Sequence, residues 1–377
     1  MSRNKGSLRR VKAMIIKEFF QIIRDPSSIL ISLILPLILL FLYGYGVSLD
    51  ADHIKLGLVL EDTSPEAQSF SESLTNSRYF DVTIKRDRRS FTDDITRGDI
   101  RGLVVIPSYF SSFRHRQDNT APIQVIADGS EPNTANFVQN YVLGAWLIWL
   151  QQQSYTEKLE GLPLVQSEPR FWYNEELESR NFLIPGSLAL IMTLIGTLLT
   201  ALVVAREWER GTMEALMSTP VSIVELLIGK LVPYFILGLC SMTMSVIVAR
   251  LIYGIPYRGH WITLLLVSGV FLVAALALGL LISTLAKNQF VAAQASMVTA
   301  FLPAFILSGF IFEITSMPQA IQYLTYLLPA RYFVASLQTL FLVGDVREVI
   351  LPNTLAMLFL GILLFMLTAR FTVKRLD

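Results

Sequence analysis

The sequence predicts an α-helical polytopic membrane protein with six transmembrane helices and a small α/β extracytoplasmic domain between spans 1 and 2. Three observations support this fold class. Of the 377 residues, 53% are hydrophobic and only 16% are charged, whereas about a quarter of a soluble chain is charged. The charged residues gather in blocks and leave uncharged runs long enough to cross a hydrocarbon core, which takes about 20 helical residues. One polar insertion of domain size separates the first run from the second.

Six apolar runs are predicted to span the membrane, the first at 28–49 and the other five within 181–377. The fourth and fifth are separated only by residues 287–289, and we predict a tight hairpin there because one continuous helix would far exceed the bilayer thickness. The alternative for the first run is a cleaved signal peptide, but its basic region and its apolar run are both longer than those of signal peptides. The runs lie between Asp25 and Asp50, Arg180 and Arg206, Lys230 and Arg250, His260 and Lys287, Lys287 and Glu313, and Glu348 and Arg370.

Lys and Arg near the span ends predict that the N- and C-termini both lie in the cytoplasm. Arg250 and Arg258 disagree, because they fall on the outer side. The single cysteine, Cys240, leaves any outer domain without disulfides, which favours a bacterial inner membrane protein. The basic residues before the first span and after the last are Arg3, Lys5, Arg9, Arg10, Lys12, Lys17, Arg24, Arg370, Lys374 and Arg375.

Residues 50–180 are predicted to form the outer, periplasmic α/β domain. Strand-like runs alternate there with helical ones. His53 and His115 have no carboxylate or cysteine at metal-ligand spacing, and no catalytic motif occurs. We therefore expect neither an enzyme nor a catalytic, cofactor or metal site. The strand-like runs are 54–60, 102–106 and 123–126, and the helical runs are 66–74, 91–97 and 133–153.

An amphipathic helix is predicted at 8–24, within the cytoplasmic segment 1–27. Its apolar residues recur at helical spacing and its basic residues lie opposite them. Such a helix suits a membrane surface with anionic head groups. The alternative is a simple positive-inside anchor, which explains the charges but not the apolar stripe. That stripe consists of Leu8, Val11, Ile15, Phe19 and Ile22.

A second, very short helix is predicted at 211–220, directly after the second span. Gly211 ends the preceding helix, Thr212 can cap the new one, and Pro220 ends it. So short a helix is unstable alone in water. We expect it to dock on a partner protein rather than to form a solvated loop, because its apolar face needs burial. That face consists of Met213, Leu216 and Met217.

The sequence also indicates where energy for transport must come from. No G-x-x-x-x-G-K-[ST] motif occurs, so the chain does not bind ATP through a P-loop. The apolar runs contain no Asp, Glu, Lys or Arg, which argues against ion coupling. If the chain transports, a partner supplies the energy.

Polar residues concentrate in the fifth span, where they either line a pathway or hold helices together. Residues 313–348 follow it, with two prolines among apolar stretches too short to cross, and we predict re-entrant or interfacial helices there. The pathway-lining candidates are Gln294, Ser296, Thr299 and Ser308.

Residues 206–216 resemble the signature of the permease subunit of ABC-2 type exporters, especially bacterial multidrug members with a large outer domain. The chain reads R-E-W-E-R-G-T-M-E-A-L, followed by Pro220 and the pair Gly229 and Lys230. The family pattern is R-E-x-E-x-G-T-x-E-x-L…P…G-K. Residues 185–186 (P-G) and 328–333 (L-P-A-R-Y-F) match as well, and the resemblance covers nearly the whole chain.

The resemblance implies that two permease subunits, identical or related, form a pathway at their interface above two separate ABC ATPase subunits, which bind ATP and Mg. Helix 8–24 then corresponds to the connecting helix. A periplasmic adaptor and an outer-membrane channel are further expected partners, with membrane lipid, and no nucleic acid is expected. The implied ATPase-coupling residues are Arg206, Glu207, Glu209, Arg210, Gly211, Thr212, Met213, Glu214, Leu216, Met217 and Pro220.

The expected function is export of a hydrophobic or amphipathic substrate, drug-like or lipid-like, from the cytoplasm or inner leaflet. An alternative from another class is a membrane-anchored receptor or envelope assembly scaffold with a ligand-binding outer domain. Six spans are many for an anchor, which disfavours it. The two hypotheses differ in whether a cytoplasmic ATPase is needed.

Overall fold

A computed structural model of the chain describes residues 2–46, 53–115, 123–129, 132–157 and 178–372. The chain divides into two units. Unit 1 comprises Met1–Ser48 and Arg170–Asp377, and unit 2 comprises Leu49–Pro169.

Among the described residues of unit 1, six helical segments are long and apolar enough to cross a membrane, in agreement with the six predicted spans. The first and fifth each contain one π-helical turn. The segments are Pro26–Gly46, made of α2 (Pro26–Ile29), η1 (Leu30–Ile34) and α3 (Leu35–Gly46); α7 (Arg180–Glu209); α9 (Ile223–Tyr253); α10 (Trp261–Ala286); Gln289–Leu307, made of α11 (Gln289–Ser296), η4 (Met297–Phe301) and α12 (Leu302–Leu307); and α15 (Arg347–Phe371).

Several of these helices extend beyond the uncharged runs that predicted them. α7 has 30 residues and is therefore about 45 Å long, whereas the hydrocarbon core is about 30 Å thick. Its last turns carry Arg206 and Glu207. α9 begins at Ile223, so Lys230 lies inside a helix and not in the loop before it. The spans are uncharged in their middle parts, but charged residues belong to their ends.

The turn between α10 and α11 is as tight as predicted. Lys287 ends α10 in the left-handed conformation with a φ of 54°. The side chain of Asn288 then caps α11 by accepting a hydrogen bond from the backbone N–H of Val291 at 3.0 Å. Two caps in succession reverse the chain within three residues.

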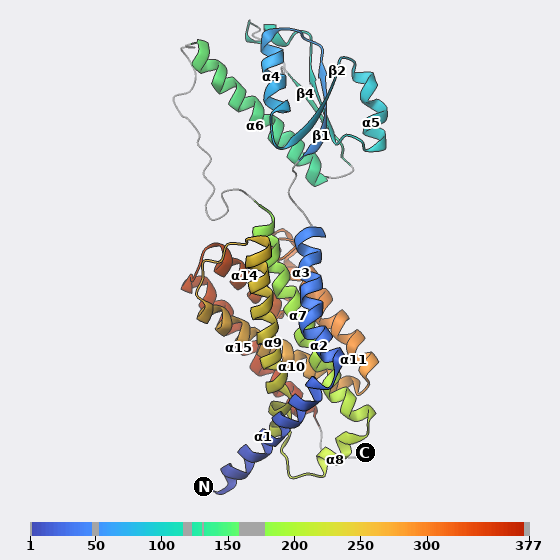
Figure 1. Cartoon of the computed structure of the whole chain (residues 1–377), viewed down its shortest axis with the longest axis vertical. Helices are drawn as coiled ribbons and strands as arrows, with labels where there is room; N and C mark the ends of the chain where they lie inside the picture. The colour runs from blue at the N-terminus through green and yellow to red at the C-terminus, as the bar shows by residue number, and fades with distance from the viewer. Residues whose placement is uncertain (1, 47–52, 116–122, 130–131, 158–177, 373–377) are drawn as a thin grey trace. The chain divides into compact units, whose positions relative to one another are not determined.

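α7 is the central helix of unit 1, with α3, α9, α10 and α14 (Pro329–Leu342) around it (Figure 1). Close approach depends on small residues, as is usual for helices in lipid. A Cβ added to Gly279 of α10 would lie 2.1 Å from the hydroxyl oxygen of Thr200 on α7. That hydroxyl donates to the carbonyl oxygen of Leu276 at 3.0 Å.

The segment 313–348 folds into short helices. They are η5 (Ile314–Ser316), α13 (Gln319–Thr325) and α14. None approaches the roughly 20 residues needed to cross the hydrocarbon core. α14 packs against the bundle, and its Phe333 ring stacks on Phe271 of α10 with 4.0 Å between ring centroids.

Unit 2 contains a four-stranded sheet in the order β2-β1-β3-β4, with β1 parallel to β2 and β3, and β4 antiparallel to β3. Its apolar residues pack in two clusters, one under α4 and α6 and the other under α5, so helices cover both faces (Figure 1). The runs at 54–60, 102–106 and 123–126 lie on β1, β3 and β4, whereas β2 was not predicted. The elements are β1 (Ile54–Leu60), α4 (Pro65–Thr75), β2 (Phe80–Lys85), η2 (Arg88–Phe91), α5 (Thr92–Arg97), β3 (Gly102–Ile106), η3 (Phe110–His115), β4 (Gln124–Ala127) and α6 (Pro132–Glu157).

Candidate coupling site at the end of α7

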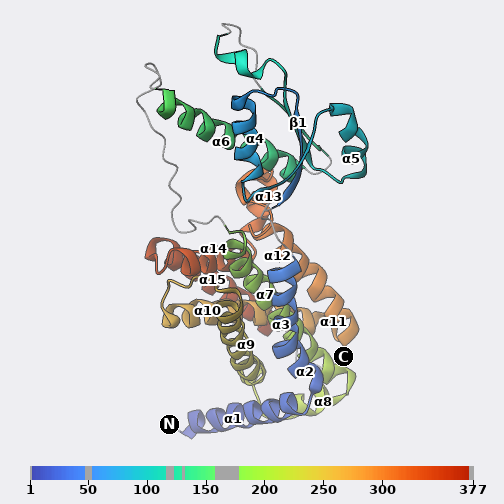
Figure 2. The ribbon, with the colours of Figure 1, turned by 45° about the horizontal axis from the view of Figure 1, so that its top comes forward.

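The last turn of α7 lies beside α1 (Ser2–Ile23), α8 (Thr212–Met217) and the start of α11 at one end of unit 1 (Figure 2). Consecutive residues of an α-helix point about 100° apart. Residues 206–209 therefore face in four directions, and each side chain contacts a different set of neighbours. We call this arrangement, together with its partners on the other helices, the α7 junction.

The centre of the α7 junction is an ionic cluster of the buried residues Glu18, Glu207 and Lys230 and the exposed Lys17. The ammonium nitrogen of Lys230 lies 2.8 Å from a Glu18 oxygen and 3.0 Å from a Glu207 oxygen. Lys17 contacts the same two oxygens at 3.2 and 2.6 Å. The cluster thus joins α1, α7 and α9 through two bridging carboxylates.

Burial makes this pairing obligatory. Glu18 is fully buried, and Lys230 and Glu207 are 1% and 5% exposed. An isolated charge in such a place costs several kcal/mol, and ion pairs with good geometry recover that cost. Two lysines and two glutamates make the ionic cluster neutral. One Glu18 oxygen, Oε2, still has no hydrogen-bond partner among the described residues. The cluster therefore has no surplus positive charge that could replace either lysine.

The neighbouring residues Gly229 and Lys230 serve the same contact. A Cβ added to Gly229 would lie 2.6 Å from the Cβ of Met14 on α1, which is closer than two non-bonded carbon atoms can come. The missing side chain lets α1 lie against α9, and Lys230 then reaches the carboxylate of Glu18. This is a physical reason for a G-K pair in the first turns of α9.

A second ion pair fixes the other half of α1. Glu225 forms a capping box with Ser222 at the start of α9. The same carboxylate accepts hydrogen bonds from the guanidinium of Arg10 at 2.7 and 3.1 Å, and one from Ser7. α1 is therefore held to α9 at two places along its length.

Arg206 links α7 to the turn between α1 and α2. Its guanidinium lies 2.9 Å from the Asp25 carboxylate, which also caps α2. Burial raises the pKa of Asp25, but hydrogen bonds from Ser27 and Ser28 and the nearby Arg206 charge outweigh that effect and lower the pKa from 3.8 to about 2. The carboxylate is therefore ionised at any physiological pH.

The other two residues of the turn contact the hairpin between α10 and α11. The ammonium of Lys287 lies 4.9 Å from the centre of the Trp208 ring, which is cation–π distance. Glu209 accepts hydrogen bonds from the backbone N–H of Gln289, at 2.9 Å, and from its side-chain amide. Both contacts tie the end of the second span to the start of the fifth.

α8 is attached to the α7 junction by its first residue. Gly211 is the N-cap and has a φ of 66°, so Thr212 is the first helical residue and not the cap. The Thr212 hydroxyl donates to the carboxylate of Glu207. Met213 is 1% exposed and belongs to the main core of unit 1.

This burial changes which residues of α8 a partner can reach. Met213 was expected on the docking face, but it packs inside its own chain, and Leu216 is half-buried against the same core. Thr212, Glu214 and Ala215 are exposed, as are Arg210 and Pro220 on either side. The Met217 side chain lies outside what the structure describes.

Burial also differs along α1. On α1 the buried residues are Met14, Glu18 and Ile22, whereas Leu8 is 76% exposed and Phe19 40% exposed. Of the predicted apolar stripe, Ile22 therefore packs against the bundle, while Leu8 and Phe19 remain exposed.

The polar residues of the fifth span differ in burial. Ser296 and Ser308 are each 1% exposed, while Gln294 and Thr299 are exposed. The hydroxyls of Ser296 and Thr299 donate to carbonyl oxygens of their own helix.

Sequence reasoning missed Lys17, Glu18 and Lys230 as site residues. A signal was present, because Glu18 is the sole acidic residue among the first 24. A lone carboxylate in a basic amphipathic helix is a candidate for specific pairing, although the sequence does not name its partners.

The comparison with known families identifies the family of this chain. The family described as ABC-2 family transporter protein matches residues 26–370. The chain belongs to this family. ABC-2 relatives include the probable multidrug ABC transporter permease YbhS of Escherichia coli K12, 49% identical over 377 residues with both chains fully covered.

More distant ABC-2 relatives cover most of the chain. The probable multidrug ABC transporter permease YbhR of the same organism is 27% identical over 333 residues, which are 86% of this chain and 87% of the relative. The inner membrane transport permease YhhJ, also from E. coli K12, is 27% identical over 251 residues, 63% of this chain and 64% of the relative. The protein is an ABC-2 type permease and a multi-pass membrane protein.

Proposed function

We propose that this chain is the transmembrane subunit of an ATP-driven exporter and that α8 is its coupling helix. A separate ABC ATPase binds ATP and Mg, and a second permease subunit, identical or related, completes the pathway. The chain lies in a bacterial inner membrane with both termini in the cytoplasm. Unit 2 then lies in the periplasm, where an adaptor and an outer-membrane channel are its candidate partners.

The observation that supports this proposal is the hydrogen bond from Thr212 to Glu207. It joins the first residue of α8 to the ionic cluster, which reaches α1, α7 and α9. Residues 208 and 209 add contacts to the hairpin before the fifth span. A force applied to the exposed side of α8 is therefore transmitted to α1, α7, α9 and the start of α11, as coupling to an ATPase requires.

Two observations support the proposed substrate class. Two relatives are named as probable multidrug permeases, and the spans of this chain carry no charge in their middle parts. Hydrophobic or amphipathic molecules suit such a path, because a charged group at membrane depth is costly without a partner. Drug-like or lipid-like compounds leaving the cytoplasm or inner leaflet are the proposed cargo.

The test is Glu207→Gln in the purified complex of permease and ATPase. Glutamine keeps the shape but removes the charge that both lysines share, so we expect a less stable chain whose assembled complexes still hydrolyse ATP but show at least tenfold less transport per complex. Glu72→Gln, on the exposed side of α4, is the matched control and should transport normally. Equal transport by the two variants would overturn the coupling role of the ionic cluster.

A further inference from the structure

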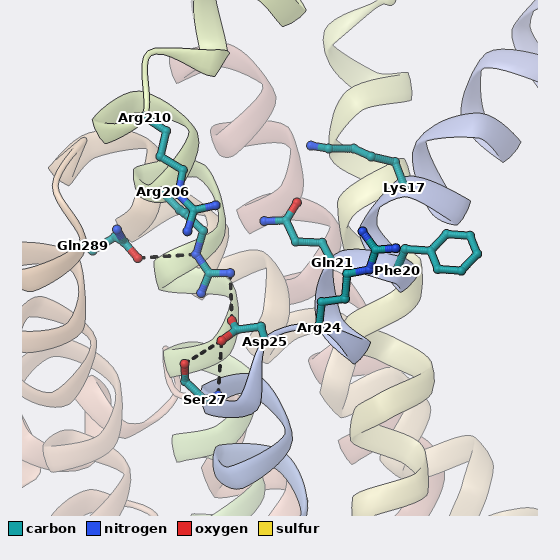
Figure 3. A pocket seen from close by; sticks show the side chains of 9 residues that line it. All are labelled: Lys17, Phe20, Gln21, Arg24, Asp25, Ser27, Arg206, Arg210 and Gln289. Carbon is teal, nitrogen blue, oxygen red and sulfur yellow. Dashed lines mark hydrogen bonds and ion pairs between the residues drawn. The ribbon is translucent and has the colours of Figure 1, made fainter.

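Beside the α7 junction lies a cavity of about 620 Å³, which we call the basic pocket. α1 forms one wall, and the end of α7 with the start of α11 forms the other. Figure 3 shows Lys17 and Gln21 extending from α1 toward the side that carries Arg206 and Arg210. The lining residues are Lys17, Phe20, Gln21, Arg24, Asp25, Ser27, Arg206, Arg210 and Gln289.

The lining of the basic pocket has an excess of positive charge. It contains four cationic side chains and a single carboxylate. Lys17 is paired with Glu207, and Arg206 with Asp25. Arg24 and Arg210 form no ion pair within the part of the chain that the structure describes. Two guanidinium groups thus border one cavity without a counter-charge.

Arg210 has a further reason to need an anion. It follows Arg206 by four residues on the same face of the helix, and like charges at this spacing repel each other. Asp25 offsets the charge of Arg206 at 2.9 Å, but nothing described offsets that of Arg210. An anion in the basic pocket would relieve this repulsion and bridge α7 to α1.

The depth of the basic pocket suits a lipid head group. It lies where the first and fifth spans begin and the second ends, which is the level at which the hydrocarbon core gives way to water. Large apolar side chains next to it are exposed: Phe20 is 57%, Ile23 60% and Phe290 70% exposed. An acyl chain would cover these surfaces while its phosphate met the arginines.

We propose that the basic pocket binds one phosphate-bearing anion, either the head group of an anionic phospholipid or free phosphate, through Arg24 and Arg210. Guanidinium groups match phosphate oxygens in pairs of hydrogen bonds. Basic pockets between membrane helices on the cytoplasmic side are known to hold such head groups. That the leaflet is the inner one rests on the orientation in the proposed function, whereas the anion site itself does not.

The experiment measures lipid binding to the full chain in an uncharged detergent by native mass spectrometry. Phosphatidylglycerol, phosphatidylcholine and inorganic phosphate are titrated in separate arms. We expect one tightly bound phosphatidylglycerol per chain and weak phosphatidylcholine binding. Each cation near a head group contributes roughly fivefold in affinity, so Arg24→Gln with Arg210→Gln should weaken phosphatidylglycerol binding about thirtyfold.

The matched control removes two cations from α1 outside the basic pocket. Arg9 and Lys12 are exposed and do not line it, so Arg9→Gln with Lys12→Gln should bind phosphatidylglycerol like the wild type. Arg24→Lys with Arg210→Lys keeps the charge and should retain most of the affinity. If the double glutamine variant does not fold, either single variant should show about a fivefold loss.

The outcomes separate the two sources of the anion and the failure of the proposal. Phosphatidylglycerol binding that inorganic phosphate does not displace identifies a lipid site. Stoichiometric binding of inorganic phosphate that Arg24→Gln abolishes identifies a free-phosphate site. Equal losses in the pocket and control variants, or no selectivity for either anion over phosphatidylcholine, overturn the basic pocket as an anion site and leave the coupling role of α8 unaffected.

Discussion

Replacing Lys230 by methionine removes one charge from the ionic cluster and shortens the unbranched side chain by only one atom. Glu18 then retains only Lys17, at 3.2 Å, while remaining fully buried. Deleting one partner of a buried ion pair costs about 3–5 kcal/mol, because the remaining charge is left without compensation. We expect a loss of this size in the free energy of unfolding, a large part of the roughly 5–15 kcal/mol typical of a folded protein.

The assay is equilibrium unfolding of the full chain in detergent micelles, followed by tryptophan fluorescence. Lys12→Met, an exposed cation on α1, is the matched control and should stay within about 0.5 kcal/mol of the wild type. Lys230→Met combined with Glu18→Gln removes one charge of each sign, so it should recover at least half of the loss. The remaining pair, Lys17 and Glu207, is 2.6 Å apart and balanced.

Two results would refute this reasoning. If Lys230→Met were no more destabilising than Lys12→Met, the buried lysine would not be needed to compensate the carboxylates. If Glu18→Gln failed to rescue Lys230→Met, the loss would come from packing and not from an unpaired charge.

Three more predictions follow from the geometry. Gly229→Ala should destabilise the chain by about 1–3 kcal/mol, because the new Cβ would lie 2.6 Å from the Cβ of Met14. The control Gly144→Ala, whose new Cβ has no neighbour within 4 Å, should be neutral or stabilising. Equal unfolding midpoints for the two variants would contradict this prediction. Gly211→Ala should reduce coupled ATP hydrolysis and transport more than Gly211→Asn, because asparagine tolerates the positive φ of 66°. Equal transport by the two variants would argue against a requirement for this backbone conformation. The lowered pKa of Asp25 means that its stabilising effect is complete above pH 3.8 and is lost as the pH falls toward about 2. The difference in stability between the wild type and Asp25→Asn should therefore be constant from neutral pH down to 3.8 and then shrink. A decline already at about pH 5–6 would contradict this assignment.

The spans could be predicted from the sequence because a hydrocarbon core imposes a minimum apolar length, which any charged residue interrupts. The α8 signature was visible for a similar reason, since Gly211 and Pro220 act locally. The partners of Glu18 could not be predicted, because the bond to Lys230 joins residues 212 positions apart. Local pattern contains no information about which distant helix approaches.

Met213 shows the other limit of sequence reasoning. Its spacing correctly indicated an apolar face on the short helix, but spacing does not say whether that face meets a partner or the chain itself. The structure buries it in the chain's own core. The strand β2 was missed because only its first residue, Phe80, is fully buried, while Ile84 is 49% exposed.

The ionic cluster also has a consequence for how the chain is made. Apart from Lys17 with its neighbour Glu18, every ion pair of α1 among the described residues is with a residue at least 190 positions later in the sequence. At translation rates of roughly 5–20 residues per second, α1 therefore waits about 10–40 s for its partners to be synthesised. During that interval the carboxylate of Glu18 must stay in water or among lipid head groups, and α1 docks only after the third span has entered the membrane. Closure of the ionic cluster thus requires that the first three spans have been synthesised.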